Sequence, residues 1–238
     1  MGPFWDGNEI WLITAGGVTF AAFPQACAVM FSGLYTPLML LLFALILRGV
    51  AFEFRRQIDS DRWRRVWDAC LVTGSFVPAL LLGVAFANIF AGIPIDGDGI
   101  FRGNLFTLLN PYGLAGGVLF VLLFAMHGTL WLAVKSTGAL QSSAAKAARR
   151  LHAPLVAATI LAVTLFGVGG LFPNLLPSSI DPAHSVTAFN SASSPLTLKI
   201  MLTVALIFLP VVIAYQAWVY VTFREKVTAR TLASEPSY

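Results

Sequence analysis

The feature that most constrains this chain is a series of six long apolar runs, which fill most of its 238 residues. Each run is close to the roughly 20 mostly apolar residues that a helix needs to cross a bilayer. Runs this long and uniform favour helices over the alternating strands of a membrane barrel. We therefore predict an all-α polytopic transmembrane helical bundle over residues 1–223, with about six spans at 10–30, 34–52, 69–91, 112–134, 151–173 and 197–222.

Small residues interrupt several of these runs. The first contains Gly16, Gly17 and Pro24, so we expect a tilted or broken helix there. Paired glycines also occur at Gly116-Gly117 and Gly169-Gly170. Because small residues let helix backbones approach closely in a membrane, we expect the spans to pack as a compact bundle.

The composition excludes an ordinary soluble domain. Hydrophobic residues make up 58% of the chain and charged residues 11%, against roughly 45–50% and 25% in soluble proteins. The mean hydropathy is +0.80. A water-soluble fold of this length could not remove so much apolar surface from solvent. The lipid bilayer is therefore the expected environment.

The positions of the basic residues predict the orientation of the chain. Thirteen of the 15 Lys and Arg residues lie in or next to the segments 53–68, 135–150 and 224–238, each at the end of an apolar run. The segments 92–111 and 174–196 hold three acids but one arginine. Because cytoplasmic loops carry the excess of Lys and Arg, both termini are predicted to be cytoplasmic, with a cytoplasmic tail at 224–238. We expect no nucleic-acid partner, although the net charge is +4.

Charged residues inside or beside the spans are the candidates for function, because charge in a membrane is costly. Arg48 either extends to the interface or binds a buried acid or a cofactor carboxylate. Asp6 and Glu9 either favour the start of a helix through its dipole or accept protons at the mouth of a pathway. Asp68 most simply caps the third span.

Metal and haem ligands are sparse. His127 lies inside the fourth span without a second histidine at helical spacing, and Cys27 and Cys70 stand alone. Axial haem ligation by His127 is possible chemistry, but a hydrogen-bonding role within the bundle is the more common use of such a residue. We expect no metal site on this chain.

Several motifs resemble those of subunit II of the bd-type quinol oxidases. The resemblance extends over nearly the whole chain, and the matching segments are 5–17, 20–24, 31–35, 47–55, Trp63-Arg64, Trp67-Asp68, 74–78, 83–85, 109–114, 172–179 and 194–201. The chain departs from the family pattern in lacking the usual first helix and about two helices between the fourth and fifth spans. It is thus expected to be a shortened member.

The resemblance implies a multi-pass protein of the bacterial plasma membrane that works as part of an enzyme. That enzyme oxidises quinol and reduces dioxygen to water, taking up protons from the cytoplasm. Two haems b and one haem d would belong to subunit I, the partner in an obligate heterodimer, and this chain would bind no cofactor. Small accessory membrane subunits are further possible partners.

The resemblance also implies roles for individual residues. Asp6, with Glu9 near it, matches the acid at the cytoplasmic entrance of a proton pathway. Arg48 and Asp68 match charged positions tied to assembly or to the haem environment. Two other functions remain as alternatives: a small secondary transporter, which would need discontinuous helices around a central site, and an independent membrane cytochrome, which would need a partner ligand for His127.

Overall fold

The computed structural model describes residues 2–166 and 174–222, and these are mostly helical. The predicted all-α fold is confirmed. The elements in chain order are α1 (Gly2–Ala22), α2 (Pro24–Gly33), α3 (Tyr35–Phe54), α4 (Asp61–Ala91), α5 (Leu105–Leu108), α6 (Pro111–Lys135), α7 (Gly138–Phe166), β1 (Asn174–Leu176), η1 (Pro182–His184), β2 (Val186–Thr187) and α8 (Pro195–Thr222).

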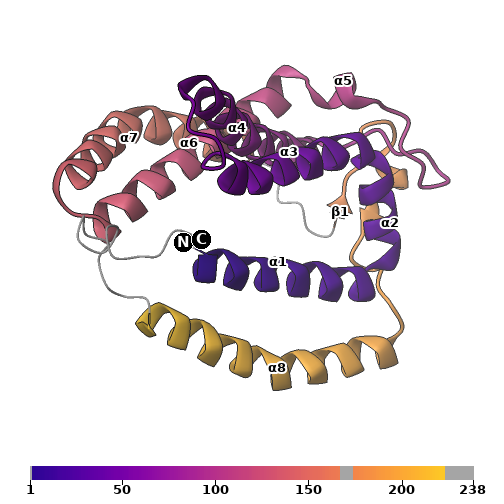
Figure 1. Cartoon of the computed structure of the whole chain (residues 1–238). Helices are drawn as coiled ribbons and strands as arrows, with labels where there is room; N and C mark the ends of the chain where they lie inside the picture. The colour runs from indigo at the N-terminus through magenta and orange to yellow at the C-terminus, as the bar shows by residue number, and fades with distance from the viewer. Residues whose placement is uncertain (1, 167–173, 223–238) are drawn as a thin grey trace.

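The long helices form two groups. In the first group α3 packs on α4, α4 on α6, and α6 on α7, so α4 and α6 lie at its centre. In the second group α1 runs beside α8, and both termini of the described chain lie toward the same end (Figure 1). The short α2 joins the two groups at the opposite end, where it contacts α3 and both strands.

Four of the predicted spans correspond to single helices. In the described part of the chain, α3, α4, α6 and α8 are long and apolar enough to cross a membrane, and a bent pair of helices is a fifth candidate. The predicted span 151–173 falls partly on α7 and partly on residues 167–173, which lie outside the described residues. The count of six spans and the side of the membrane on which the termini lie stay predictions.

The bent pair is the first apolar run, which breaks into α1 and α2 at an angle of 118°. The break falls at Phe23, and Pro24 opens α2 in the position where its missing N–H costs least. Carbonyls at the end of α1 are bonded from a distant segment: Ser193 donates its backbone N–H to Ala22 at 2.8 Å and its hydroxyl to Ala21 at 2.6 Å. The expectation of a broken first helix is confirmed.

Two predicted loops are mostly helix instead. Helix α4 begins at Asp61 rather than at residue 69, and α7 begins at Gly138 rather than at residue 151. Hydropathy marks only the part of a helix that is apolar, whereas charged and Ala-rich sequences also favour helix. The segment 55–60 and the two residues Ser136 and Thr137 are therefore the true connections.

The contact between α4 and α6 depends on glycines. A Cβ atom on Gly83 would overlap the carbonyl oxygen of Gly116, and one on Gly116 would lie 2.7 Å from the carbonyl oxygen of Gly83. Backbone therefore meets backbone at this crossing, as in small-residue contacts between membrane helices.

The buried apolar core lies at the end of the molecule where α2, α4 and α5 meet the strands. Its members are Ala26, Val29, Leu34, Val84, Ile93, Ile95, Leu108, Leu176 and Val186. The strands β1 and β2 are antiparallel, with Asn174 opposite Thr187 and Leu176 opposite Val186. The segment after α4 joins them: the N–H of Ile93 donates to the carbonyl oxygen of Pro177, and the N–H of Ser179 donates to the carbonyl oxygen of Ile93. This core closes one end of the helix groups.

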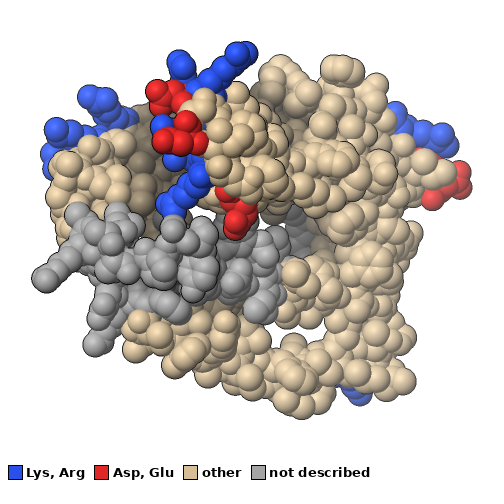
Figure 2. All heavy atoms as spheres, in the orientation of Figure 1, with Lys and Arg blue, Asp and Glu red and all other residues tan. Residues whose placement is uncertain are grey.

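Charge is concentrated at the two ends of the molecule. Basic and acidic side chains gather where α3 leads into α4, basic side chains alone lie over α7, and a smaller group of both signs lies on the loop beyond α4 (Figure 2). The surface between is largely uncharged in this view. This distribution suits a chain whose middle lies in lipid.

The α4–α6 crossing can be tested by Gly116→Ala. The added methyl group would lie 2.5 Å from Cβ of Ala87 and against the backbone of Gly83, neither of which can rotate away. Overpacking of this kind costs about 1–3 kcal/mol, so thermal unfolding in detergent micelles should shift to lower temperature.

Gly128→Ala, in the same helix, is the matched control because its Cβ would meet nothing within 4 Å. Equal unfolding temperatures for the two variants would contradict the close crossing.

Candidate functional site

The hairpin of α3 and α4 holds two of the four residues that the sequence singled out. Arg48 lies in α3 and Asp68 in α4. The two helices run antiparallel, so Arg48 is level with Gly74, whereas Arg55 is level with Asp68. Arg48 and Asp68 thus belong to one helix contact but lie about two turns apart along it, and Asp68 is bonded to Arg55.

Arg48 is half-buried between the two helices. A Cβ on Gly74 would lie 2.8 Å from Cβ of Arg48 and 2.7 Å from the carbonyl oxygen of Ala44. Only a glycine at position 74 therefore leaves room for the stem of Arg48. The arginine is thus built into the α3–α4 contact.

Asp68 does not cap a helix, because α4 begins seven residues earlier. Its carboxylate accepts two hydrogen bonds from Arg55, from Nε at 2.5 Å and from Nη2 at 3.1 Å. This two-point geometry fixes the plane of the guanidinium. Arg55 was not among the predicted residues, since only the helix register places it opposite Asp68.

Aromatic residues close the turn beside this ion pair. Trp67 packs against Phe54 and Trp63, with ring centroids 5.4 and 5.6 Å apart. The indole Nε1 of Trp63 donates to the carbonyl oxygen of Phe54 at 2.7 Å, which satisfies one of the last acceptors of α3. Indole rings of this kind suit the headgroup level of a membrane.

Asp6 and Glu9 lie in the first turns of α1. Their side chains are outside the described part of the structure, which gives only their place in the helix. The start of α1 lies toward the same end of the molecule as the turn between α3 and α4 (Figure 1). The proton-pathway assignment therefore stays a prediction.

The histidines do not form a haem site within the described residues. His127 is exposed on α6, His152 is exposed on α7, and His184 lies in η1 among the loops. No three His, Cys, Asp or Glu side chains in the described ranges converge as metal ligands would. These positions do not fit a haem enclosed by this chain.

A buried amide network joins α4, α5 and α6. Asn88 is 3% exposed, and its Nδ2 donates to the carbonyl oxygens of Val84 at 2.8 Å and Leu108 at 2.7 Å. Its Oδ1 accepts from Nδ2 of Asn110 at 2.8 Å, and Asn110 caps α6 by accepting from the N–H of Gly113. A satisfied buried network of this kind fixes the relative position of helix ends. Sequence reasoning missed Asn88, because a single polar residue in an apolar run carries no signal of its partners.

A second ion pair orders the loop after α4. Asp96 accepts hydrogen bonds from the backbone N–H of Ile100 at 2.8 Å and of Asp98 at 3.1 Å, and from Nε of Arg102 at 2.6 Å. The bond from Ile100 and the charge-assisted bond from Arg102 hold the pKa of Asp96 below its usual value of 3.8.

This chain is similar to known proteins over most of its length. A family model described as cytochrome bd terminal oxidase subunit II matches residues 1–167 and 153–223. The chain is 34% identical to cytochrome bd ubiquinol oxidase subunit 2 of Bacillus subtilis (strain 168), over 96% of this chain and 83% of the relative. It is 32% identical to a probable cytochrome oxidase subunit 2 of Haemophilus influenzae and 30% identical to cytochrome bd-I ubiquinol oxidase subunit 2 of Escherichia coli K12, each over 92% of this chain and 80% of the relative.

These alignments also bear on the expected shortening. They extend over 282 to 307 positions, more than the 238 residues of this chain, so the relatives contain stretches that it lacks. The two segments matched by the family model overlap at residues 153–167, directly after the stretch 135–150 in which helices were expected to be missing.

The order of the 92–104 loop should depend on pH. Because the folded pKa of Asp96 lies below its unfolded value, the carboxylate contributes stability above about pH 4, and this contribution is lost as the pH falls through the folded pKa. Asp96→Asn should therefore lower the thermal unfolding temperature at pH 6, and its difference from wild type should shrink as the pH falls below 4 toward the folded pKa. Asp98→Asn is the control, because its carboxylate makes no hydrogen bond among those described for this loop; an identical pH profile for both variants would contradict the assignment.

Proposed function

Since the chain belongs to the cytochrome bd terminal oxidase subunit II family, we propose that it is the haem-free subunit of a quinol:dioxygen oxidoreductase of the bacterial plasma membrane. The observation that carries this proposal is the family match, which covers nearly the whole chain in sequence order. In this role the chain supports a haem-bearing subunit I and contributes to proton uptake from the cytoplasm.

The exposed apolar surface supports a permanent membrane partner. In the most apolar 18 residues of α8, no residue is buried within this chain, and in the corresponding stretch of α6 only 6% of the residues are buried. Side chains such as Leu206, Phe208 and Val211 are more than half exposed. Lipid covers part of this surface in the proposal, and subunit I covers the rest in an obligate heterodimer. Small accessory membrane subunits would occupy the surface that the missing helices leave.

Two haems b and one haem d would be held by subunit I, where they supply the electron transfer from quinol and the reduction of dioxygen. His127 and His152 are exposed on α6 and α7, so neither lies in a pocket enclosed by this chain. This chain's own contribution is to position helices and to deliver protons.

Asp6 and Glu9 are the proposed proton-accepting groups. Reduction of dioxygen to water consumes protons, which have to reach the reaction centre from the aqueous phase. A carboxylate at the entrance of that route can bind a proton and release it inward. Both residues lie in the first turns of α1, at the end of the molecule where the basic connections gather. That end would face the cytoplasm according to the distribution of Lys and Arg.

Arg48 and Asp68 are proposed to act in assembly or in the haem environment. Each acts through the α3–α4 contact: Gly74 admits the stem of Arg48, and Asp68 orients Arg55. A change at either residue would alter the surface that this helix pair offers to subunit I.

The proposed function is tested by purifying the tagged chain gently from its native membrane and recording a reduced-minus-oxidised optical spectrum. Bands of haem b and haem d together with a larger co-purifying membrane protein are expected. Arg48→Ala should lower the yield of that complex or shift its haem bands, and Arg48→Lys should retain more of both.

Haem bands without a partner would instead support an independent cytochrome. Absence of both haem and partner would overturn the proposal and leave the transporter alternative. An Arg48→Ala complex with full yield and an unchanged spectrum would assign that arginine to simple extension toward the interface.

The proton role is tested separately by Asp6→Asn. The amide cannot be protonated in the working range, so oxygen consumption with an excess of quinol should fall several-fold. Haem content and subunit ratio should stay at the wild-type level. Asp98→Asn, at the opposite end of the molecule, is the control, and equal turnover of the two variants would remove Asp6 from the pathway.

A further inference from the structure

A cavity of about 430 Å³ opens beside the turn between α3 and α4, and the function proposed above does not use it. It is lined by Phe52, Glu53, Arg55, Arg56 and Leu71. We propose that this cavity binds the phosphate group of an anionic membrane phospholipid. The inference rests on the chain being a membrane protein and does not depend on the proton role of Asp6.

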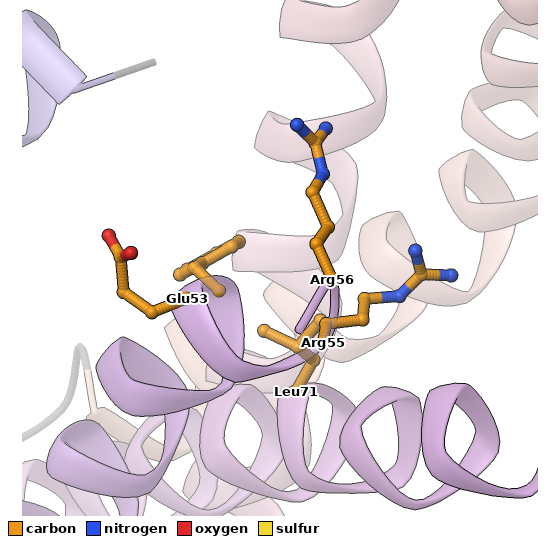
Figure 3. Close-up of a pocket in the computed structure, with 5 residues that line it drawn as sticks. Glu53, Arg55, Arg56 and Leu71 are labelled. Atoms are coloured by element: carbon orange, nitrogen blue, oxygen red, sulfur yellow. The ribbon is translucent and has the colours of Figure 1, made fainter. Parts of the chain in front are cut away.

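Within the described part of the chain, the ion pairs around the turn include only one of the two cavity arginines. Asp59 and Asp61 both bind Arg64, at 3.0 and 3.2 Å, and Asp68 binds Arg55. The carboxylate of Glu53 points away from the two guanidinium groups of the cavity (Figure 3). No carboxylate in the described part of the chain forms an ion pair with Arg56, which is exposed. An anion from outside the chain can therefore bind to it.

The pairing of Arg55 with Asp68 prepares a second donor. The carboxylate takes hydrogen bonds from Nε and Nη2, which lie on one edge of the guanidinium. Five N–H groups are available on an arginine, so the Nη1 edge keeps its donors for another acceptor. Arginines present planar, fixed donors that match phosphate oxygens. Arg55 and Arg56 together thus offer a pair of cationic donors at the cavity.

The remaining lining suits the acyl chains of a lipid better than a free anion. Phe52 is 54% exposed, and Leu71 lies beside it on α4. Seven and eleven residues before Phe52, the half-buried apolar side chains of Leu45 and Leu41 lie on the same face of α3 and continue this surface toward the middle of the span. A ligand with a charged head and an apolar body matches this sequence of surfaces.

The level of the cavity in the membrane agrees with a headgroup. It lies where the apolar part of α3 ends and the arginine-rich turn begins. Trp63 and Trp67 lie in the first two turns of α4, next to this turn, and tryptophans mark the membrane–water interface. The cytoplasmic leaflet of a bacterial membrane carries anionic lipids that attract such basic segments.

The proposal is tested on the complex of this chain with its co-purifying partner, reconstituted in nanodiscs of phosphatidylcholine with added phosphatidylglycerol. Native mass spectrometry counts the phosphatidylglycerol that each complex retains. Arg56→Gln should weaken retention of one lipid about fivefold, as expected for loss of one cationic group near the membrane surface. Arg62→Gln is the matched control, because Arg62 is exposed at the start of α4, next to the same turn, but does not line the cavity. Arg56→Lys should restore part of the retention.

Equal retention by wild-type protein and Arg56→Gln would overturn the proposal. An equal decrease for Arg56→Gln and Arg62→Gln would also overturn it, since it would show general surface attraction rather than a built site. Displacement of the lipid by millimolar inorganic phosphate would assign the cavity to a free anion. Should haem and partner fail to co-purify, the lipid count on the chain alone still separates this inference from the proposed oxidase function.

Discussion

The structure depends above all on the need to bond every backbone polar group without water. A lipid environment leaves helices as the natural solution, because each N–H and C=O is then satisfied within its own segment. The helix is interrupted inside an apolar run at Phe23-Pro24. There Ser193, about 170 residues away along the sequence, donates hydrogen bonds to the carbonyl oxygens of Ala21 and Ala22. The other irregular segments lie at the ends of the helices. The strands β1 and β2 and the loop after α4 bond to one another in that region.

Helix α4 is the element that connects the other helices of its group, because it packs on both α3 and α6. Its middle meets α6 through Gly83 and Gly116 without side chains between them. Toward one end Asn88 binds the connection to α6, and toward the other Asp68 binds the end of α3. The polar contacts lie near the helix ends and the small residues near the middle. This division follows from the cost of polar groups in lipid, which is lowest near the interface.

Hydropathy predicted the spans because burial in lipid acts on the average character of about 20 residues. The helices that became α3, α4, α6 and α8 were therefore found, and proline correctly marked the break after α1. The starts of α4 and α7 were missed, since polar residues continue a helix beyond the apolar region. The partner of Asp68 could not be found from the sequence, because Arg55 and Arg56 are neighbours and only the register of two helices chooses between them. Asn110 lies in the matching segment 109–114, but nothing in the sequence indicated its bond to Asn88, 22 residues away.

The geometry of α1 makes the proposed role of Asp6 depend on the partner subunit. Helix α1 contacts mainly α2 and α8, and its described polar tie to the rest of the chain, through Ser193, lies at its C-terminal end. Asp6 is 16 residues from Ala22, which corresponds to about 24 Å along a helix with a rise of 1.5 Å per residue. Helix α8 packs beside α1, but no residue in the most apolar part of α8 is buried within this chain. Helix α8 therefore does not fix α1 against the α3–α4 group. A tie at one end of a helix does not set the position of a carboxylate at the other end. In the proposed complex, a contact with subunit I places Asp6 for proton uptake, which is why we propose an obligate heterodimer rather than a subunit that takes up protons alone.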